Sequence, residues 1–508
     1  MTKESKNTRV ERSWIMYDWA NSAYATIILA AIFPIYFATI APDADVWWGV
    51  GTSIATLIGA LTSPFLGAIA DYSGMKMKCF LISLIGGVVF TSLMAVFNNW
   101  VLLLAGYVLS SIGFSASCLF YDSFLTDVTT PERMDTVSAR GYAMGYIGGS
   151  TIPFVIAIIL NMTMENASLA VKLSIVLTSV WWLVFSIPFL LHVKQQHSLG
   201  EVPKNIIGSA MSNVVKTFKE ISKDKGMLLY VFAYFFYIDG VNTVIAMSTA
   251  YGTTLGLGTI GMIIALLVTQ LIAAPASILF SKISEKIGAV KMISFAVVVY
   301  FIVCVVGFYM GFSLEPSQMD AEQLFTERYI YASGEYYDEF YDIYTEGFSV
   351  LNSASRKTEL DEILVSFAVG NAGNYDESTF QDISKELLLV MDAISLDGNY
   401  DHALRRSNIL FWLMAGLVGT CQAGIQSLSR SFFGRLVPPE KSNEYFGFFD
   451  IFCKFAAVIG PALYALTKEL TGRSSYGILS LMLLFALGFI LLQLRSRYLK
   501  VNGITEVF

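Results

Sequence analysis

The feature that most limits what this chain can fold into is a series of twelve long apolar stretches. A helix needs about 20 mostly apolar residues to cross the roughly 30 Å hydrocarbon core of a bilayer. Lipid offers the backbone no hydrogen-bond partner, so each stretch is predicted to be a helix. The stretches cover residues 14–41, 47–70, 78–97, 101–125, 139–161, 170–193, 228–251, 257–281, 292–313, 407–433, 445–468 and 475–494.

The composition indicates a polytopic membrane protein rather than a soluble one, because 55% of the 508 residues are hydrophobic and only 14% are charged. The five cysteines lie in or beside the apolar stretches without a CxxC pair, so we expect neither a disulfide framework nor a metal site. No GxxxxGK[ST] loop is present for ATP. We therefore expect no cofactor, no enzymatic activity and no nucleic-acid partner.

The distribution of lysine and arginine predicts the orientation of the chain. Segments on the side of the N-terminus hold 23 of these residues, whereas the short loops on the other side hold only Lys172, Lys468 and Arg473. By the positive-inside rule both termini are expected in the cytoplasm. The polar, basic start carries no signal-peptide cleavage pattern, so we expect the first span to be retained. The bacterial plasma membrane is the expected location.

The chain repeats itself weakly, which indicates two related halves. Three short motifs recur in the same order, at offsets of 221, 214 and then 308 residues. The increase of 94 residues between the last two offsets indicates an insertion between the ninth and tenth spans. The matched motifs are Asp18-Trp-Ala-Asn21-Ser22 with Asp239-Gly-Val-Asn242-Thr243, Asp71-Tyr-Ser-Gly74 with Glu285-Lys-Ile-Gly288, and Pro131-Glu-Arg133 with Pro439-Glu-Lys441.

The fold class that follows is an all-α membrane protein with two bundles of six helices and a small extracytoplasmic helical insertion. Parallel repeats of six spans place a substrate site between the halves near mid-membrane. The predicted segments are an N-terminal bundle (1–193), a cytoplasmic linker (194–226), spans seven to nine (227–313), the insertion (314–406), spans ten to twelve (407–497) and a cytoplasmic tail (498–508).

The insertion at 314–406 is acidic, with 19 Asp and Glu against 6 Lys and Arg, while the rest of the chain has a net charge of +6. Apolar residues recur at helical spacing in its second half, from Leu360 to Ile394, which predicts a small helical cap. A structural or solubilising role and a role in binding a protein partner or guiding substrate both remain open.

Two polar faces inside the spans are the main candidates for binding solute or protons. Asp18, Asn21 and Ser22 share one face of the first span, and Asp239, Asn242 and Thr243 repeat that face in the seventh. A carboxylate inside a span is costly and usually functional, so the two faces are expected to meet at one cavity. Alternatively, Asp18 is hydrated at the helix end or paired with Arg12 or Arg140. Further candidates for the cavity lining are Gln270, Gln422 and Gln426.

Charged residues elsewhere in the spans are candidates for gating or ion pairing. Asp450 and Lys454 are four residues apart, so they are expected to pair within the eleventh span, either as a structural pair or as a switch that breaks when the halves move. Arg140 and Arg430 belong to the same group. Asp71 follows the second span, where the helix dipole disfavours an anion. Lys76, Lys78 or the amino end of another helix must compensate it, which predicts a latch between the halves.

Specific motifs give the chain a family resemblance. Gly67-x-x-x-Asp71-x-x-Gly74-x-Lys76 resembles the loop signature of the major facilitator superfamily, with Tyr72 where that family usually has Arg or Lys. "YDWANSAYAT", "YIDGVNT", "PPEKSNEYFGFFDIFCKFAAVIGP" and "QSLSRS" resemble the unknown-major-facilitator family, prokaryotic relatives of the fungal autophagy-related vacuolar amino-acid effluxer. The resemblance implies a secondary transporter that exports amino acids or similar metabolites, and a role for Asp71 in closing the cytoplasmic side.

Two hypotheses of function follow from these patterns. The first is a proton-coupled secondary transporter that works by alternating access, as a monomer in the lipid bilayer, on a small solute. The second is a membrane receptor or scaffold whose acidic outer segment binds a protein partner. Deleting 314–406 distinguishes the two hypotheses. Loss of the cellular phenotype with transport intact would favour the receptor or scaffold.

Overall fold

The computed structural model describes residues 3–257, 259–332 and 398–504, and within these ranges every regular element is helical. Twelve helical segments are long and apolar enough to cross a membrane, which confirms the number of spans predicted from the sequence. They are Thr8–Ile40, Val46–Ala70, Met75–Met94, Trp100–Val128, Pro131–Thr163, Ala167–His192, Lys225–Thr254, Ile264–Ile287, Ala289–Pro316, His402–Leu436, Pro439–Thr471 and Ser474–Val501.

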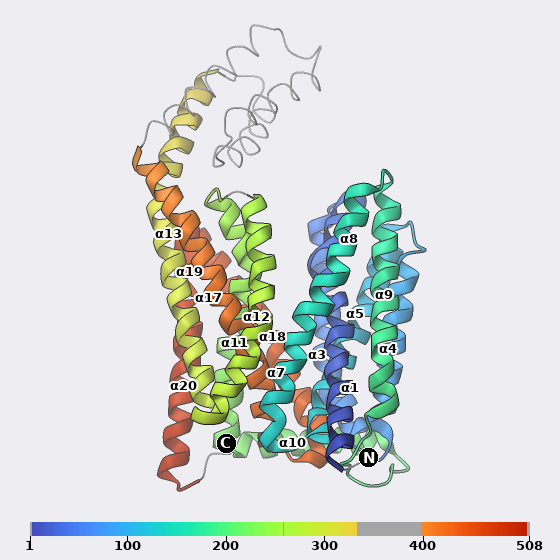
Figure 1. Ribbon diagram of the computed structural model, residues 1–508. Helices are drawn as coiled ribbons and strands as arrows, with labels where there is room; N and C mark the ends of the chain where they lie inside the picture. The colour runs from blue at the N-terminus through green and yellow to red at the C-terminus, as the bar shows by residue number, and fades with distance from the viewer. Residues whose placement is uncertain (1–2, 258, 333–397, 505–508) are drawn as a thin grey trace.

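The first six spans form the N-terminal bundle (Figure 1). Its first and fifth spans are each interrupted by a π-helical turn, a feature that often marks functional positions, and these two spans pack against each other. The elements are α1 (Lys3–Tyr24), η1 (Ala25–Ala30), α2 (Ile32–Ile40), α3 (Ala44–Ala70), α4 (Met75–Met94), α5 (Trp100–Ser123), α6 (Leu125–Val128), η2 (Pro131–Arg133), α7 (Met134–Met144), η3 (Gly145–Thr151), α8 (Ile152–Thr163) and α9 (Ala167–His192).

The last six spans form the C-terminal bundle, and the linker helix α10 (Ile206–Lys223) lies across the end of the molecule where the chain passes between the bundles (Figure 1). Aromatic rings pack against one another within each bundle, Trp14 and Tyr17 on Tyr121 in one and Tyr234 on Tyr237 and Phe449 in the other. The elements are α11 (Lys225–Thr254), α12 (Thr259–Ile287), α13 (Ala289–Ala332), α17 (Gly398–Leu436), η4 (Pro439–Lys441), α18 (Ser442–Thr471), α19 (Ser474–Ser480) and α20 (Met482–Val501).

The helices beside the insertion are longer than the sequence predicted. The ninth span continues without a break to Ala332, and the tenth begins at Gly398. Parts of the expected insertion, 314–332 and 398–406, are therefore continuous with the membrane helices, because their residues go on favouring helix beyond the apolar stretch. The predicted helical cap around Leu360 to Ile394 lies outside the described residues.

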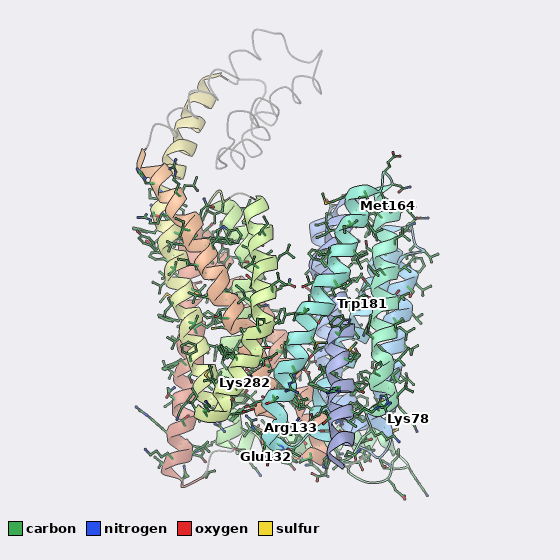
Figure 2. All side chains as sticks on the ribbon, in the orientation of Figure 1. Lys78, Glu132, Arg133, Met164, Trp181 and Lys282 are labelled. Atoms are coloured by element: carbon green, nitrogen blue, oxygen red, sulfur yellow. The ribbon has the colours of Figure 1, made fainter. Side chains whose placement is uncertain are left out.

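Both ends of the chain lie at the same end of the molecule, which we call the termini side; the opposite end is the insertion side (Figure 1). The two bundles lie together on the termini side and diverge toward the insertion side. Figure 2 places Lys78, Arg133 and Lys282 near the termini side and Met164 at the opposite end. The positions of these three basic residues agree with the charge asymmetry seen in the sequence.

Candidate functional site

Polar contacts between the two bundles concentrate on the termini side. In the described part of the chain, the recorded hydrogen bonds from one bundle to the other join residues toward the termini-side ends of several helices. The elements involved are α1, α3, α4, α5, α7, η3, α12, α17 and α18. The contacts farthest from that side involve Tyr146 with Gln426 and Ser63 with Asp450. The termini side is therefore closed by a polar network.

Arg430 of α17 is the centre of this network and reaches into the N-terminal bundle. Its Nη1 donates to Asp122 Oδ1 at 2.9 Å, and its Nη2 lies 3.3 Å from Asp18 Oδ2. Its Nε donates to Ser138 Oγ at 2.9 Å, and Nη2 also donates to the Ser138 carbonyl at 3.0 Å. The side chain is 4% exposed. A buried guanidinium needs this many acceptors to offset its lost hydration.

Three aromatic rings surround the same guanidinium. Its carbon lies 4.4 Å from the ring centre of Tyr142, 4.8 Å from Trp14 and 5.2 Å from Tyr121. Rings at this distance attract a cation through their negative faces. The Tyr121 hydroxyl also donates to Asp18 Oδ2 at 2.7 Å. We call Trp14, Asp18, Tyr121, Asp122 and Tyr142 the cage.

The position of Asp18 corrects one alternative from the sequence. Its partner is Arg430 of the other bundle, and neither Arg12 nor Arg140 pairs with it. Arg140 is exposed, and its side chain takes part in no recorded ion pair within the described ranges. The reason is geometric, because Gly141 faces the cage while Arg140 points away from it. A Cβ at Gly141 would lie 3.2 Å from Arg430 Nη2.

A second charged cluster lies next to the cage, closer to the termini side. Asp135 of α7 accepts hydrogen bonds from Arg435 and Ser431 of α17 and from Ser284 of α12. The Arg435 side chain is 2% exposed. Asp135 therefore ties α7 to two helices of the other bundle at once.

Asp71 is bound by the amino end of a helix, one of the three partners considered from the sequence. Its oxygens accept from Asn443 N (3.0 Å), Asn443 Nδ2 (2.7 Å) and Glu444 N (3.0 Å) at the start of α18. These N–H groups have no partner within the helix, and the helix dipole favours an anion there. Gly67 allows this approach, since a Cβ there would lie 2.9 Å from Glu444 Cα.

Lys76 does not pair with Asp71, although it belongs to the same loop. Its Nζ donates to Asp127 Oδ2 at 2.6 Å and to Ser442 Oγ at 3.1 Å, and the side chain is 1% exposed. Gly74 begins α4 with φ 71°, a left-handed conformation that favours glycine. Lys76 therefore adds a second contact from this loop to the start of α18.

The linker helix α10 contacts both bundles on the termini side. Asn213 Nδ2 donates to the Tyr72 hydroxyl at 3.2 Å, and Glu220 accepts from Lys441 Nζ at 2.8 Å and from the Tyr445 hydroxyl at 3.1 Å. The hydrogen bond from Lys441 holds the pKa of Glu220 below its ordinary value. The Tyr72 contact uses the position where the superfamily signature usually has a basic residue.

Asp450 and Lys454 form an ion pair within α18, as their spacing predicted. The pair also contacts the other bundle, because Ser63 Oγ of α3 donates to Asp450 Oδ2 at 2.5 Å and Lys454 Nζ donates to Ser63 Oγ at 3.2 Å. The contact joins α3 and α18, which pack closely.

Asp239 has surroundings quite different from those of Asp18. It is fully buried near the middle of α11, where Oδ1 accepts from Gly460 N at 2.9 Å and from Thr243 Oγ1 at 3.4 Å. Oδ2 has no hydrogen-bond partner, and no ion pair is recorded for this carboxyl among the described residues. Among the described residues the two aspartates share no recorded hydrogen-bond partner, since Asp18 bonds across the bundles and Asp239 bonds within one.

The remaining polar candidates fall into separate places. Gln426 accepts from the Tyr146 hydroxyl at 3.1 Å across the bundles, whereas Gln422 lines an apolar cavity of about 90 Å³ inside the C-terminal bundle. Asn21 lies beside Cys118 and Ser22. In the part of the chain that the structure describes, Gln270 Oε1 is buried without a hydrogen-bond partner. Asn242 is half-buried on α11.

Sequence reasoning missed several residues that hold the bundles together. Asp122 lies inside an apolar stretch and carried the same signal as Asp18, an acidic residue within a span. Asp135 and Asn443 follow span ends, and only their proximity in space identifies them. Trp14 and Tyr142 are ordinary aromatic residues in an aromatic-rich chain, so no pattern pointed to a cage.

The comparisons with known proteins agree on family and fold. The family model described as "Vacuole effluxer Atg22 like" matches residues 49–323 and 406–498. A Bacillus subtilis (strain 168) protein, "Uncharacterized MFS-type transporter YxiO", is 36% identical over 500 residues, which cover 96% of this chain and 94% of that protein. Its description is that of a transporter and not of an enzyme.

Two solved structures share the architecture. The human organic anion transporter MFSD10 matches with a TM-score of 0.61 at 12% identity, over 96% of this chain and 99% of that one. The major facilitator superfamily proton:xylose symporter XylE matches with a TM-score of 0.58 at 10% identity, over 96% and 95% of the two chains. At such identities the likeness shows the fold alone, the major facilitator fold.

Proposed function

Because the chain belongs to the Atg22-like family of major facilitator transporters, we propose that it is a secondary active transporter that exports a small, amino-acid-like solute by alternating access, coupled to protons. The observation that carries the proposal is the polar network between the bundles, which lies on the termini side alone among the described contacts. A network of this kind can break and re-form as one unit when the bundles rock.

Asp239 is the proposed proton carrier. A fully buried carboxylate with one unpartnered oxygen and no recorded cation is costly in a membrane, so its surroundings favour the neutral acid. Because α11 and α18 belong to the same bundle, the protonation step needs a movement of these two helices within the C-terminal bundle. That movement would break the hydrogen bond from Gly460 and admit water, which stabilises the charged form. The carboxyl then gains and loses a proton as the two sides open in turn.

Export is supported by the family description, a vacuole effluxer, and a polar solute such as an amino acid is supported by the polar side chains between the bundles. A receptor or scaffold is not favoured, because the relative that covers nearly the whole chain is described as a transporter. The residues that stay candidates for contacting the solute are Asp18, Asn21, Ser22, Asn242, Gln270, Gln422 and Gln426.

Reconstitution into liposomes tests the coupling. Purified protein should accumulate a labelled amino acid against its gradient when a pH gradient is applied, and Asp239→Asn should abolish accumulation but keep exchange. Glu165, an exposed carboxylate between the fifth and sixth spans, offers the matched control, since Glu165→Gln should behave as wild type. Wild-type exchange that ignores pH entirely would contradict proton coupling, and no flux of any amino acid would contradict the substrate class.

A further inference from the structure

All the groups that hold the Arg430 guanidinium belong to the other bundle. Trp14 and Asp18 come from α1, Tyr121 and Asp122 from α5, and Tyr142 from α7. These helices are parts of the N-terminal bundle, whereas Arg430 lies on α17 of the C-terminal bundle. The cage is therefore complete without any residue of the second bundle.

The chemistry of the cage is that of a cation receptor. Two carboxylates supply charge and hydrogen-bond acceptors, and three rings supply negative faces that suit ammonium or guanidinium groups. A cation is seated in it, since the guanidinium is 4% exposed and bonds to both carboxylates. Gly141 leaves the room that this cation fills, because a Cβ there would lie 3.2 Å from Arg430 Nη2.

Separation of the bundles must leave this receptor empty. In the described part of the chain Arg430 is the only recorded ion-pair partner of Asp18 and of Asp122. Two carboxylates left together in a partly buried site repel each other, and each has lost its counter-ion. The site must then take up protons or another cation from the compartment to which it opens.

We infer that the cage is the binding site for a cationic group, an ammonium or guanidinium, of the transported solute, and that Arg430 is a tethered competitor which displaces it. The inference rests on the proposed alternating access. When the termini side opens, Arg430 withdraws and the solute's cation takes its place among Asp18, Asp122 and the three rings. When that side closes, Arg430 returns at high effective concentration and releases the cation toward the other side.

This arrangement also gives transport a direction. Arg430 competes only in the state closed on the termini side, so the affinity of the cage for the solute is high when that side is open and low when it is closed. A solute loaded from the termini side is therefore released on the insertion side. The guanidinium works here through its position and charge, and no covalent step is involved.

Equilibrium binding to purified protein in detergent tests the inference without any transport. The probes are L-arginine and L-citrulline, which have similar shapes but differ in the charge of the terminal group. Arg430→Ala should bind arginine about tenfold or more tightly than wild type, as expected for a charged group in a desolvated aromatic site, with no gain for citrulline. Adding Asp122→Asn to Arg430→Ala should remove the gain.

Arg435→Ala is the matched control, because it removes a buried arginine from the same helix and frees Asp135 but leaves the cage occupied. It should not reproduce the gain. Three outcomes would each overturn the inference. They are an equal gain in affinity for arginine and citrulline, an equal gain for arginine in Arg430→Ala and Arg435→Ala, and proton uptake by Arg430→Ala without arginine binding.

A second variant keeps the test valid if Arg430→Ala fails to fold. Asp71→Asn leaves the cage and Arg430 intact but weakens the contact with the start of α18, so it should raise arginine binding by favouring the open termini side. Tighter binding of arginine by this variant, without tighter binding of citrulline, supports the cage. Unchanged arginine binding refutes it. If arginine binds to the cage but liposomes show no proton-coupled transport, only the proposed function is contradicted. If transport is proton-coupled but arginine does not bind to the cage, only the cage is contradicted.

Discussion

At the scale of single residues, the same sequence motif has two electrostatic outcomes. Asp18 and Asp239 start matching motifs, and each faces a glycine of the fifth span of its own bundle, Gly141 or Gly460. Asp18 lies 3.3 Å from an arginine of the other bundle, whereas the hydrogen bonds recorded for Asp239 among the described residues come from its own bundle. The first residue therefore senses the position of the bundles, and the second is suited to hold a proton.

The glycine beside Asp239 should be intolerant of a side chain. A Cβ at Gly460 would lie 2.7 Å from Asp239 Oδ1 and 2.9 Å from Thr243 Cβ, so Gly460→Ala should cost about 1–3 kcal/mol of stability through overpacking. Thermal unfolding in detergent measures this as a lower Tm. Gly416→Ala is the control, because nothing lies within 4 Å of a Cβ there. An equal Tm for the two variants would contradict the prediction.

At the scale of elements, the start of α18 is held by a side chain of the other bundle. Its orphan N–H groups point at Asp71, which follows α3. The repeat counterpart of Asp71 in the second half is Glu285, which accepts from the Thr136 hydroxyl at 2.6 Å and has no recorded hydrogen bond to the N–H groups of a helix start in the described ranges. The two-fold relation of the sequence is thus not kept in the contacts, because only one of the two loops meets a helix end.

Removing the carboxylate at position 71 should open the termini side. Asp71→Ala loses three hydrogen bonds to the start of α18, each contributing about 0.5–1.5 kcal/mol, so the open population should rise roughly tenfold or more. Spin labels at Lys78 and Lys282, which lie in different bundles on that side, report the change as a longer distance (Figure 2). Glu285→Ala breaks an exposed contact and should have a much smaller effect. If both variants shift the distance equally, Asp71 has no special role.

Burial makes this contact sensitive to pH. It raises the pKa of Asp71 to about 7, although hydrogen bonds from Asn443 and the charge of Lys76 oppose the rise. Once the bundles separate, the carboxyl in water should return to a pKa of about 3.9. Between these two pH values the closed form binds more protons than the open form. The contribution of Asp71 to the stability of the closed form is therefore complete below about pH 4 and is lost as the pH rises through about 7.

The measurement compares the same label pair, at positions 78 and 282, at pH 5 and pH 8. The closed population of wild type should fall as the pH rises, and Asp71→Asn, which cannot titrate, should show a shallower fall. The difference between the two curves isolates this residue from Glu444 and the other acidic groups nearby. Parallel curves would show that another group carries the pH dependence.

At the scale of the whole molecule, we propose that the termini side faces the cytoplasm of a bacterial cell. Lysine and arginine gather on that side, and both ends of the chain lie there (Figure 1). The closed state described above is then closed to the cytoplasm. In that orientation the cage loads solute from the cell interior, which agrees with the proposed export.

Reporter fusions test the orientation. Green fluorescent protein attached after Phe508 should fluoresce, and alkaline phosphatase at the same position should be inactive, because each reports a cytoplasmic location. A protease site placed within 333–397 should be cleaved from outside in intact cells. Active phosphatase at the C-terminus would reverse the proposed topology and with it the direction of export.

The sequence was sufficient for the parts of the fold that depend on local chemistry. The number of spans, their order and the pairing of Asp450 with Lys454 follow from apolar length and helical spacing. It was insufficient where distant helices meet. Asp122 could have been noticed as an acidic residue within a span, but nothing in its neighbours pointed to Arg430, which is 308 positions away.

What the sequence determined by itself is that this chain lies in a membrane as twelve helices in two related halves, because lipid allows the backbone no other satisfied conformation. Only the tertiary structure decided which charges meet. Arg430 enters a cage made by three helices of the other bundle, whereas Asp239 has no ion-pair partner among the described residues. Each nevertheless has the sequence features of an ordinary intramembrane charge. Such partners depend on how two separate bundles pack, and no local periodicity encodes that arrangement.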